Sequence, residues 1–309
     1  MTAIRKTGSG KASCWKKSSW KKSSWKKKCM VVAIAATMTA PCFGQSDERI
    51  ITIGSSITEL VYALGGGEQV VAVDVTSQQP LQVKELPTIG YHRALATEGL
   101  LSLKPDWIIG SGDMGPPVVL EQLKKSQIPV EVLPVDSTIN NLYQRIDTLA
   151  DLLDREEEGQ RLTQDIQEQI AEANKLFKGR KPRVLFLLAM GNSPMVAGNN
   201  TSADSLITLA GGENVAAKSF SRYSTLSAEA MLAMQPDLVL ITGNNARTYD
   251  SEAVFKMLPA LIATPAGKSD RIISIDGSLL VAGLGPRIGE AALKLAQDFY
   301  PQSSKQPNS

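Results

Sequence analysis

The sequence has very little cysteine, histidine and aromatic side chain. Its 309 residues include three cysteines and one histidine, and Phe, Trp and Tyr together make up 5%. The cysteines (Cys14, Cys29 and Cys42) all lie before residue 45, so the chain beyond that point has no disulfide, thiolate metal site or cysteine nucleophile. The single histidine, His92, excludes a metal site built from several histidines and any Ser-His-Asp triad that does not use it.

Motifs for nucleotide binding and for catalysis are also missing. No Walker A sequence occurs, and no Gly-x-Gly-x-x-Gly turn follows the first predicted strand. The glycines at 65–67 follow a predicted helix, which is the wrong context for a phosphate-binding loop. Apolar residues at 43% and charged residues at 21% are ordinary for a soluble globular protein. We therefore expect a binding protein rather than an enzyme.

Charge is divided unevenly along the chain. Residues 1–44 contain ten of the 33 Lys and Arg residues and no acidic residue, which leaves 23 basic and 31 acidic side chains from residue 45 onward. The net charge of that larger part is −8. Because this net charge is negative, we expect no nucleic-acid partner.

Residues 1–44 have the order of a secretory signal peptide. A basic stretch precedes an apolar run at 30–39 and then Ala-Pro-Cys-Phe-Gly at 40–44. The run is about half of the roughly 20 residues that span a bilayer as a helix. We predict export to the periplasm. The alternative is a basic membrane-surface anchor, because Trp15, Trp20 and Trp25 lie among the lysines.

From residue 45 onward, short apolar runs alternate with amphipathic stretches. This alternation predicts an α/β fold with mainly parallel sheets and crossover helices. The predicted strands are 49–53, 70–73, 107–110, 130–133, 184–188, 238–242 and 272–275. The predicted helices are 56–64, 117–126, 137–153, 202–209, 251–258 and 286–300.

An internal repeat predicts two similar Rossmann-like lobes. Residues 64–70 resemble 209–215, and residues 97–106 resemble 228–237 in the same order. Each copy of the second segment ends in Pro-Asp, which should end a helix and begin a strand.

Residues 155–178 keep apolar spacing typical of one long helix, which would join the lobes. We therefore predict a signal peptide at 1–44, lobes at 45–154 and 179–309, and a ligand cleft between them.

The loop at 89–98, Ile-Gly-Tyr-His-Arg-Ala-Leu-Ala-Thr-Glu, is the candidate ligand site. It places Tyr91, His92 and Arg93 side by side at the end of a lobe. A tyrosine phenolate can ligate ferric haem iron. A phenol has an ordinary pKa of about 10, which iron and a neighbouring guanidinium both lower. The alternative is a surface loop with an amphipathic tyrosine.

The chain resembles the haem (hemin) ABC-transporter periplasmic substrate-binding proteins, which are grouped with vitamin B12 and siderophore carriers. The resemblance covers about residues 50–300. The segments that match the family are Gly-Ser-Ser-Ile-Thr-Glu-Leu at 54–60, Ile-Gly-Tyr at 89–91, Arg-Ala-Leu at 93–95, Glu-Gly at 98–99, Gly-Asp-Met-Gly-Pro-Pro at 112–117 and Met-Val-Ala-Gly at 195–198.

This resemblance implies that Tyr91 is the axial ligand of haem iron. It also implies that the haem pocket is drawn from His92, Arg93, Met114, Met195, Arg222 and Tyr223. We expect Arg93 or Arg222 to pair with a haem propionate or with the phenolate. In the second lobe, Arg-Tyr-Ser-Thr-Leu-Ser at 222–227 departs from the family's more frequent Tyr-Lys-Pro-Leu-Ser. Some members of the family have a histidine ligand in the second lobe, and this sequence has no histidine there. His92 lies over the face of the haem ring or is solvated, and a direct bond to iron is the further alternative.

The implied function is capture of haem and its delivery, as a monomer, to an inner-membrane ABC permease for iron uptake. Glu98 and Glu229 occupy equivalent places in the two repeats, and in the related superfamily such residues dock onto permease arginines. Compensation of a helix dipole is the alternative role for each. A carrier of cobalamin or a ferric siderophore is the alternative function, and an enzyme on the same framework is a further one.

Overall fold

The computed structural model describes residues 48–189, 194–243 and 249–301. The signal peptide predicted at 1–44 lies outside the described residues. Within the described ranges, the structure contains no helix whose length and apolar character would let it cross a membrane.

The first lobe is built on a four-stranded parallel sheet with the order β2-β1-β3-β4. Its central strands are almost entirely buried because helices cover both faces, as is usual for parallel sheets. The elements are β1 (Ile50–Ile53), α1 (Ser55–Ala63), β2 (Val70–Val73), α2 (Thr97–Ser102), β3 (Trp107–Ser111), α3 (Pro117–Lys125), β4 (Val130–Leu133) and α4 (Ile139–Leu152), with 3-10 turns η1 (Gly67–Gln69) and η2 (Leu81–Glu85).

The second lobe has a six-stranded mixed sheet whose main path is β10-β9-β5-β6-β8, with β7 paired to β5. The strands predicted from apolar runs pair in parallel, whereas the short β6 is antiparallel to both β5 and β8. The strands β6, β7 and β8 have only two or three residues each and were not predicted from the sequence. The elements are β5 (Arg183–Ala189), β6 (Met195–Ala197), α6 (Ser202–Leu209), β7 (Glu213–Asn214), β8 (Tyr223–Thr225), α7 (Ala228–Met234), β9 (Leu238–Gly243), α8 (Ser251–Met257), η4 (Pro259–Ala263), α9 (Pro265–Lys268), β10 (Ile272–Ser274), η5 (Gly277–Leu280) and α10 (Ile288–Phe299).

The internal repeat is visible in hydrogen bonds at matching atoms. In the first lobe, Asp106 Oδ2 accepts from the backbone N–H of Arg49 at 2.9 Å. In the second, Asp237 Oδ2 accepts from the backbone N–H of Arg183, also at 2.9 Å. The guanidinium of each arginine also donates to carbonyls at the end of the helix that comes before the Pro-Asp pair, α2 for Arg49 and α7 for Arg183. As predicted, each Pro-Asp pair lies between the end of a helix and the start of the next strand, α2 and β3 in the first lobe and α7 and β9 in the second.

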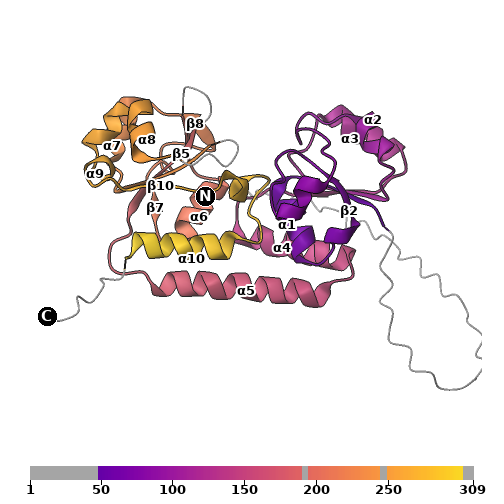
Figure 1. The fold of residues 1–309 in the computed structure, drawn as a ribbon. Coiled ribbons are helices and arrows are strands. Elements are labelled where there is room, and N and C mark those ends of the chain that lie inside the picture. The colour runs from indigo at the N-terminus through magenta and orange to yellow at the C-terminus, as the bar shows by residue number, and fades with distance from the viewer. Residues whose placement is uncertain (1–47, 190–193, 244–248, 302–309) are drawn as a thin grey trace, which may run out of the picture. The chain divides into compact units, whose positions relative to one another are not determined.

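The helix α5 (Glu156–Lys175) packs against α4 of the first lobe and against α10 and α6 of the second (Figure 1). One apolar cluster runs through all of these helices. It includes Leu142 and Ile146 of α4, Ile166 of α5, and Ile288 and Ala292 of α10. The predicted α/β fold, with two similar lobes joined by a long helix, is confirmed.

A polar network links α1 and α4 to the segment that precedes α10. The guanidinium of Arg145 is buried and donates to the hydroxyl of Ser56 at 3.1 Å and to the carbonyls of Ala282 and Leu284. Burial lowers the pKa of Arg145 to about 10, so the side chain remains a cation at neutral pH. Arg287 makes a bidentate ion pair with the buried Glu59, with both contacts at 2.7 Å. Sequence reasoning missed these pairs, because their partners are 89 to 228 residues apart.

Candidate functional site

The candidate site lies at the carboxyl edge of the first sheet, where parallel strands end and where ligands commonly bind in open α/β sheets. Gly54 follows β1, Asp74 follows β2, and Gly112 follows β3. The backbone N–H of Gly54 donates to Asp74 Oδ1 at 2.9 Å, which joins the first two of these ends. Gly54 has φ +106°, and an added Cβ would stand 2.7 Å from that of Ala282, so a larger residue does not fit.

Backbone hydrogen bonds bring the Tyr91 loop to this edge. Ile89 donates to the carbonyl of Val73 at 3.0 Å, and Val75 donates to the carbonyl of Gly90 at 2.9 Å. Gly90 has φ +90°, which turns the chain outward after this pairing. The loop then closes with a turn, in which the backbone N–H of Ala94 donates to the carbonyl of Tyr91 at 2.8 Å. The position of Tyr91 therefore follows from sheet-like pairing beside β2.

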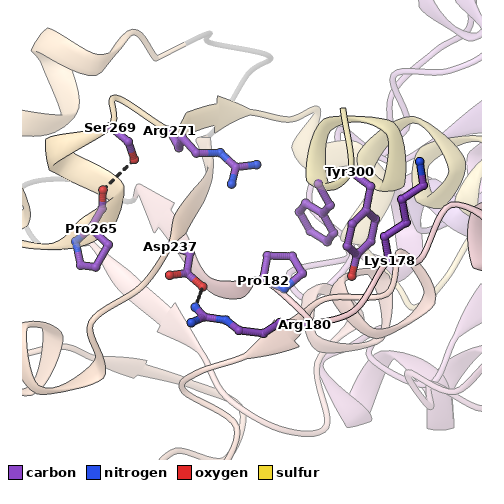
Figure 2. Close-up of a pocket in the computed structure, with 9 residues that line it drawn as sticks. Lys178, Arg180, Pro182, Asp237, Pro265, Ser269, Arg271 and Tyr300 are labelled. Carbon is purple, nitrogen blue, oxygen red and sulfur yellow. Dashed lines mark hydrogen bonds and ion pairs between the residues drawn. The ribbon is translucent and has the colours of Figure 1, made fainter. Parts of the chain in front are cut away.

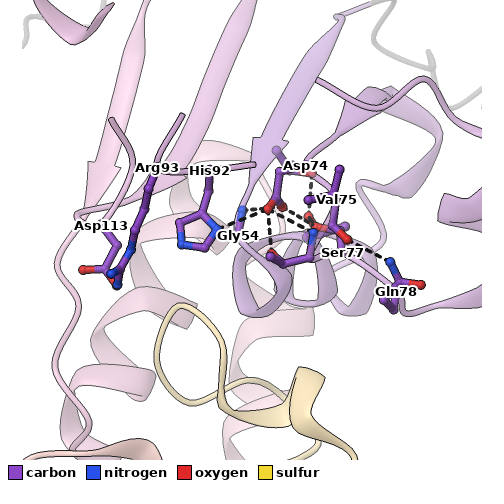
Figure 3. A network of polar contacts seen from close by, with 11 residues as sticks. Gly54, Asp74, Val75, Ser77, Gln78, His92, Arg93 and Asp113 are labelled. Carbon is purple, nitrogen blue, oxygen red and sulfur yellow. Dashed lines mark hydrogen bonds and ion pairs between the residues drawn. The ribbon is translucent and has the colours of Figure 1, made fainter. Parts of the chain in front are cut away.

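Tyr91 and His92 lie in contact but in different surroundings. Tyr91 is 47% exposed, whereas His92 is 3% exposed. Their ring centroids are 4.3 Å apart, with 57° between the ring planes. The alternative that His92 is solvated is wrong, because the imidazole points into the lobe, toward Asp74 (Figure 3). The phenol is thus available to a ligand, while the imidazole forms part of its support.

Asp74 is a fully buried carboxylate that sequence reasoning missed. It accepts hydrogen bonds from Thr76, Ser77 and the backbone of Gly54, and His92 Nδ1 lies 3.4 Å from its Oδ2. Burial alone would raise the pKa of Asp74, but these contacts outweigh burial and lower it below its ordinary value of 3.8. The signal in the sequence was a polar residue directly after a buried strand.

Arg93 pairs with Asp113, which follows β3 (Figure 3). Its Nη2 lies 2.7 Å from Asp113 Oδ2, and both side chains are partly exposed. An exposed ion pair contributes about 0 to 1 kcal/mol, so another anion can displace Asp113 at little cost. The structure thus provides a partner for Arg93 that the sequence analysis did not name.

The two methionines among the pocket candidates have different surroundings. Met114 is 4% exposed and packs with Ile53, Leu95 and Ile108 in an apolar cluster. In this structure Met114 is a core residue, and its assignment to the haem pocket stays a prediction. Met195 is partly buried on β6, opposite Thr225 of β8.

The candidates of the second lobe lie at the start of β8. Arg222 is exposed with φ +60°, and its backbone pairs with Asn199 and Gly198. The ring of Tyr223 packs edge-on against the buried Phe186, with centroids 6.5 Å apart. Burial raises the pKa of Tyr223 to about 12, so its phenol stays protonated at neutral pH. Tyr223 therefore forms a phenolate less readily than an ordinary tyrosine does.

Glu98 and Glu229 are each the second residue of equivalent helices, α2 and α7. Both carboxylates are exposed, as a docking role requires. The helix caps differ, because the Ser227 hydroxyl caps α7 whereas Ala96 leaves α2 without a side-chain cap.

A hollow of about 320 Å³ lies at the base of the second lobe, lined by Lys178, Arg180, Pro182, Asp237, Pro265, Ser269, Arg271, Phe299 and Tyr300 (Figure 2). Three of its four charged side chains, those of Arg180, Asp237 and Arg271, already have structural partners. Arg180 pairs with Asp237, and Arg271 donates to the carbonyl of Asp298. A second hollow of about 300 Å³ lies beside α10. Tyr91 lines neither hollow, and the ligand cleft between the lobes stays a prediction.

No cluster of three or more His, Cys, Asp or Glu suited to a free metal ion occurs among the described residues. The donor that the site does offer is the oxygen of one tyrosine. A single exposed phenol is a poor ligand set for a bare ion, but it fits a metal that arrives with most of its coordination already supplied by a macrocycle.

The family model of the periplasmic binding proteins matches residues 50–279. The structure is similar to that of the periplasmic heme-binding protein HutB of Vibrio cholerae, with 43% identity and a TM-score of 0.77, covering 83% of this chain and 100% of that one. It is also similar to a periplasmic heme-binding protein from Pseudomonas aeruginosa, with 35% identity and a TM-score of 0.76, covering 83% of this chain and 94% of that one. The vitamin B12-binding protein of Pectobacterium atrosepticum is 28% identical over 215 residues, which are 68% of this chain and 76% of that one. The chain thus belongs to the periplasmic binding protein family.

Proposed function

We propose that this protein captures haem in the periplasm and delivers it to an ABC permease of the inner membrane for haem and iron uptake. The observation that carries the proposal is Tyr91, a half-exposed phenol at the carboxyl edge of the first sheet. The two heme-binding proteins compared above support the same ligand at 43% and 35% identity. In this role the protein acts as a monomeric, exported carrier and catalyses no reaction.

Cobalamin is the second candidate ligand, because of the similarity to a vitamin B12-binding protein at 28% identity. Haem is favoured because an exposed tyrosine oxygen is a suitable axial donor for ferric iron. Cobalamin carries its own axial base on its lower face, so it needs no protein oxygen.

Direct titration distinguishes these ligands. We expect the purified protein to bind one equivalent or more of hemin, with an absorbance spectrum of high-spin ferric haem coordinated by a phenolate. Cobalamin and a ferric siderophore, added in excess, should neither displace the hemin nor bind on their own. Binding of cobalamin in preference to hemin would refute the haem assignment.

Delivery to the permease is proposed to depend on Glu98 and Glu229, which are exposed at equivalent places in the two lobes. Opposite charges across such an interface set orientation and encounter rate more than affinity. Glu98→Arg combined with Glu229→Arg should leave hemin affinity within about twofold of wild type and lower haem uptake at least about tenfold.

The uptake assay uses cells or proteoliposomes that contain the cognate permease. Glu252→Arg serves as a matched control, because Glu252 is likewise an exposed residue in the first turn of a helix of the second lobe, α8. Normal uptake by the double variant would exclude the docking role.

A further inference from the structure

The imidazole of His92 faces the buried carboxylate of Asp74 at 3.4 Å. Asp74 is itself fixed, because its Oδ1 accepts from Gly54 N at 2.9 Å and Ser77 Oγ at 2.8 Å, and its Oδ2 accepts from Thr76 Oγ1 at 2.6 Å. These hydrogen bonds hold the carboxylate of Asp74 in one position. The imidazole must therefore adjust to the carboxylate, and not the reverse.

The Nδ1 atom of His92 is the imidazole nitrogen that faces Asp74. It lies 3.4 Å from Oδ2 and, within the described part of the chain, has no hydrogen-bond partner of standard geometry. A shift of a few tenths of an ångström would make this a charge-assisted hydrogen bond. Such a hydrogen bond would orient the ring, as carboxylates do for histidines near metals.

The anchored ring is in turn the surface on which Tyr91 rests. The 4.3 Å between the ring centroids is close for two aromatic side chains, and Tyr91 is otherwise half exposed. The backbone on the other side of His92 is also held, because its carbonyl accepts from Gly115 N at 2.9 Å. The contacts therefore form a series from the buried carboxylate of Asp74, through the imidazole of His92, to the half-exposed phenol of Tyr91.

We propose that His92, anchored by Asp74, is a positioning residue that sets the direction in which the Tyr91 phenol oxygen meets its ligand. This inference rests on the proposed haem function, because it concerns how the proposed iron ligand is presented. It assigns to His92 no bond to iron. This role requires two features of residue 92: a ring that contacts the ring of Tyr91, and a nitrogen donor that faces the carboxylate of Asp74.

Two variants remove these features one at a time. His92→Phe keeps a ring of similar size against Tyr91 but lacks the donor to Asp74. His92→Asn keeps a nitrogen donor near the place of Nδ1 but lacks the ring. Val119→Ala is the control for a general loss of packing, because Val119 is buried in the apolar cluster of this lobe.

The first measurement uses the protein without hemin. With ¹³C-labelled tyrosine, the ring signal of Tyr91, assigned by its absence in Tyr91→Phe, should be displaced in wild type by the current of the His92 ring. In His92→Asn it should move to the averaged position of a free tyrosine. Val119→Ala should keep the wild-type position, although its melting temperature falls.

The second measurement uses hemin-loaded protein. Both His92 variants should still show phenolate coordination, but with a broadened or shifted phenolate-to-iron absorption band, and should release hemin to excess apomyoglobin about tenfold faster than wild type. Val119→Ala should keep the wild-type band and release rate.

Each remaining outcome rejects the proposal in a different way. A wild-type band, release rate and Tyr91 signal in both variants would mean that His92 only fills the core. Complete loss of iron coordination in both variants, with Tyr91→Phe unaffected, would make His92 itself the ligand. A wild-type protein that binds no hemin would refute the proposed function, whereas an unchanged Tyr91 ring signal in His92→Asn would refute this inference alone.

Discussion

Tyr91→Phe is expected to abolish the phenolate-to-iron absorption band and to weaken hemin binding about 100-fold, or about 2.8 kcal/mol. Phenylalanine keeps the ring that packs on His92 at 4.3 Å and removes the oxygen alone. With Tyr91 as the proposed axial ligand, the substitution removes that ligand, while burial of the porphyrin surface remains. Binding should therefore weaken without disappearing. Tyr91→Ala, which also removes the ring, should bind more weakly still.

Absorbance titration and competition with a second haem protein measure these affinities. Tyr300→Phe is the matched control, because Tyr300 also loses one hydroxyl, which donates to the Gly211 carbonyl at 2.9 Å, at the base of the second lobe. Its hemin spectrum should match wild type. If Tyr91→Phe retained both the band and the affinity, Tyr91 would not be the iron ligand.

Arg287→Ala is expected to lower the free energy of unfolding by about 3 kcal/mol. The substitution leaves Glu59, which is 5% exposed, as a buried carboxylate without its bidentate partner. It also removes the contact of Arg287 Nη1 with Asp276 Oδ2 at 3.0 Å. Because these contacts join α1 to the segment before α10, the loss should appear as a lower denaturation midpoint of the whole protein.

Two variants separate charge from geometry. Arg287→Lys keeps a cation but cannot form the bidentate pair, so it should fall between wild type and Arg287→Ala. Arg287→Ala combined with Glu59→Gln removes the unpaired charge and should recover part of the loss. A denaturant midpoint for Arg287→Ala equal to that of wild type would show that the network contributes nothing to stability.

The same network should make stability depend on pH. Burial raises the pKa of Asp276, but hydrogen bonds from Ser278 and Arg287 outweigh this and lower it below 3.8. A carboxyl group with a lowered pKa stabilises the fold fully above its ordinary pKa, and this contribution is lost as pH falls through the lower, folded value. The stability difference between wild type and Arg287→Ala should therefore shrink in that acidic window.

The regular elements were predictable because their signals are local. The runs at 70–73 and 130–133 are strands with those same bounds, and the helix at 202–209 is also as predicted. The repeat in the sequence led directly to the matching bonds of Asp106 and Asp237. By contrast, β6, β7 and β8 are stabilised by pairing with neighbours and carry no periodic pattern of their own.

By itself, the sequence determined that this protein has two repeated α/β lobes joined by a long helix and that one loop carries its candidate ligand residues. Tertiary structure decided what surrounds those residues. In the fold, Tyr91 is half exposed, His92 is buried beside Asp74, and Met114 is buried in the core. It also paired Arg287 with Glu59, 228 residues away. The physical reason is range: helix and strand patterns arise among neighbours along the chain, whereas burial and charge pairing depend on which distant segments the fold brings together.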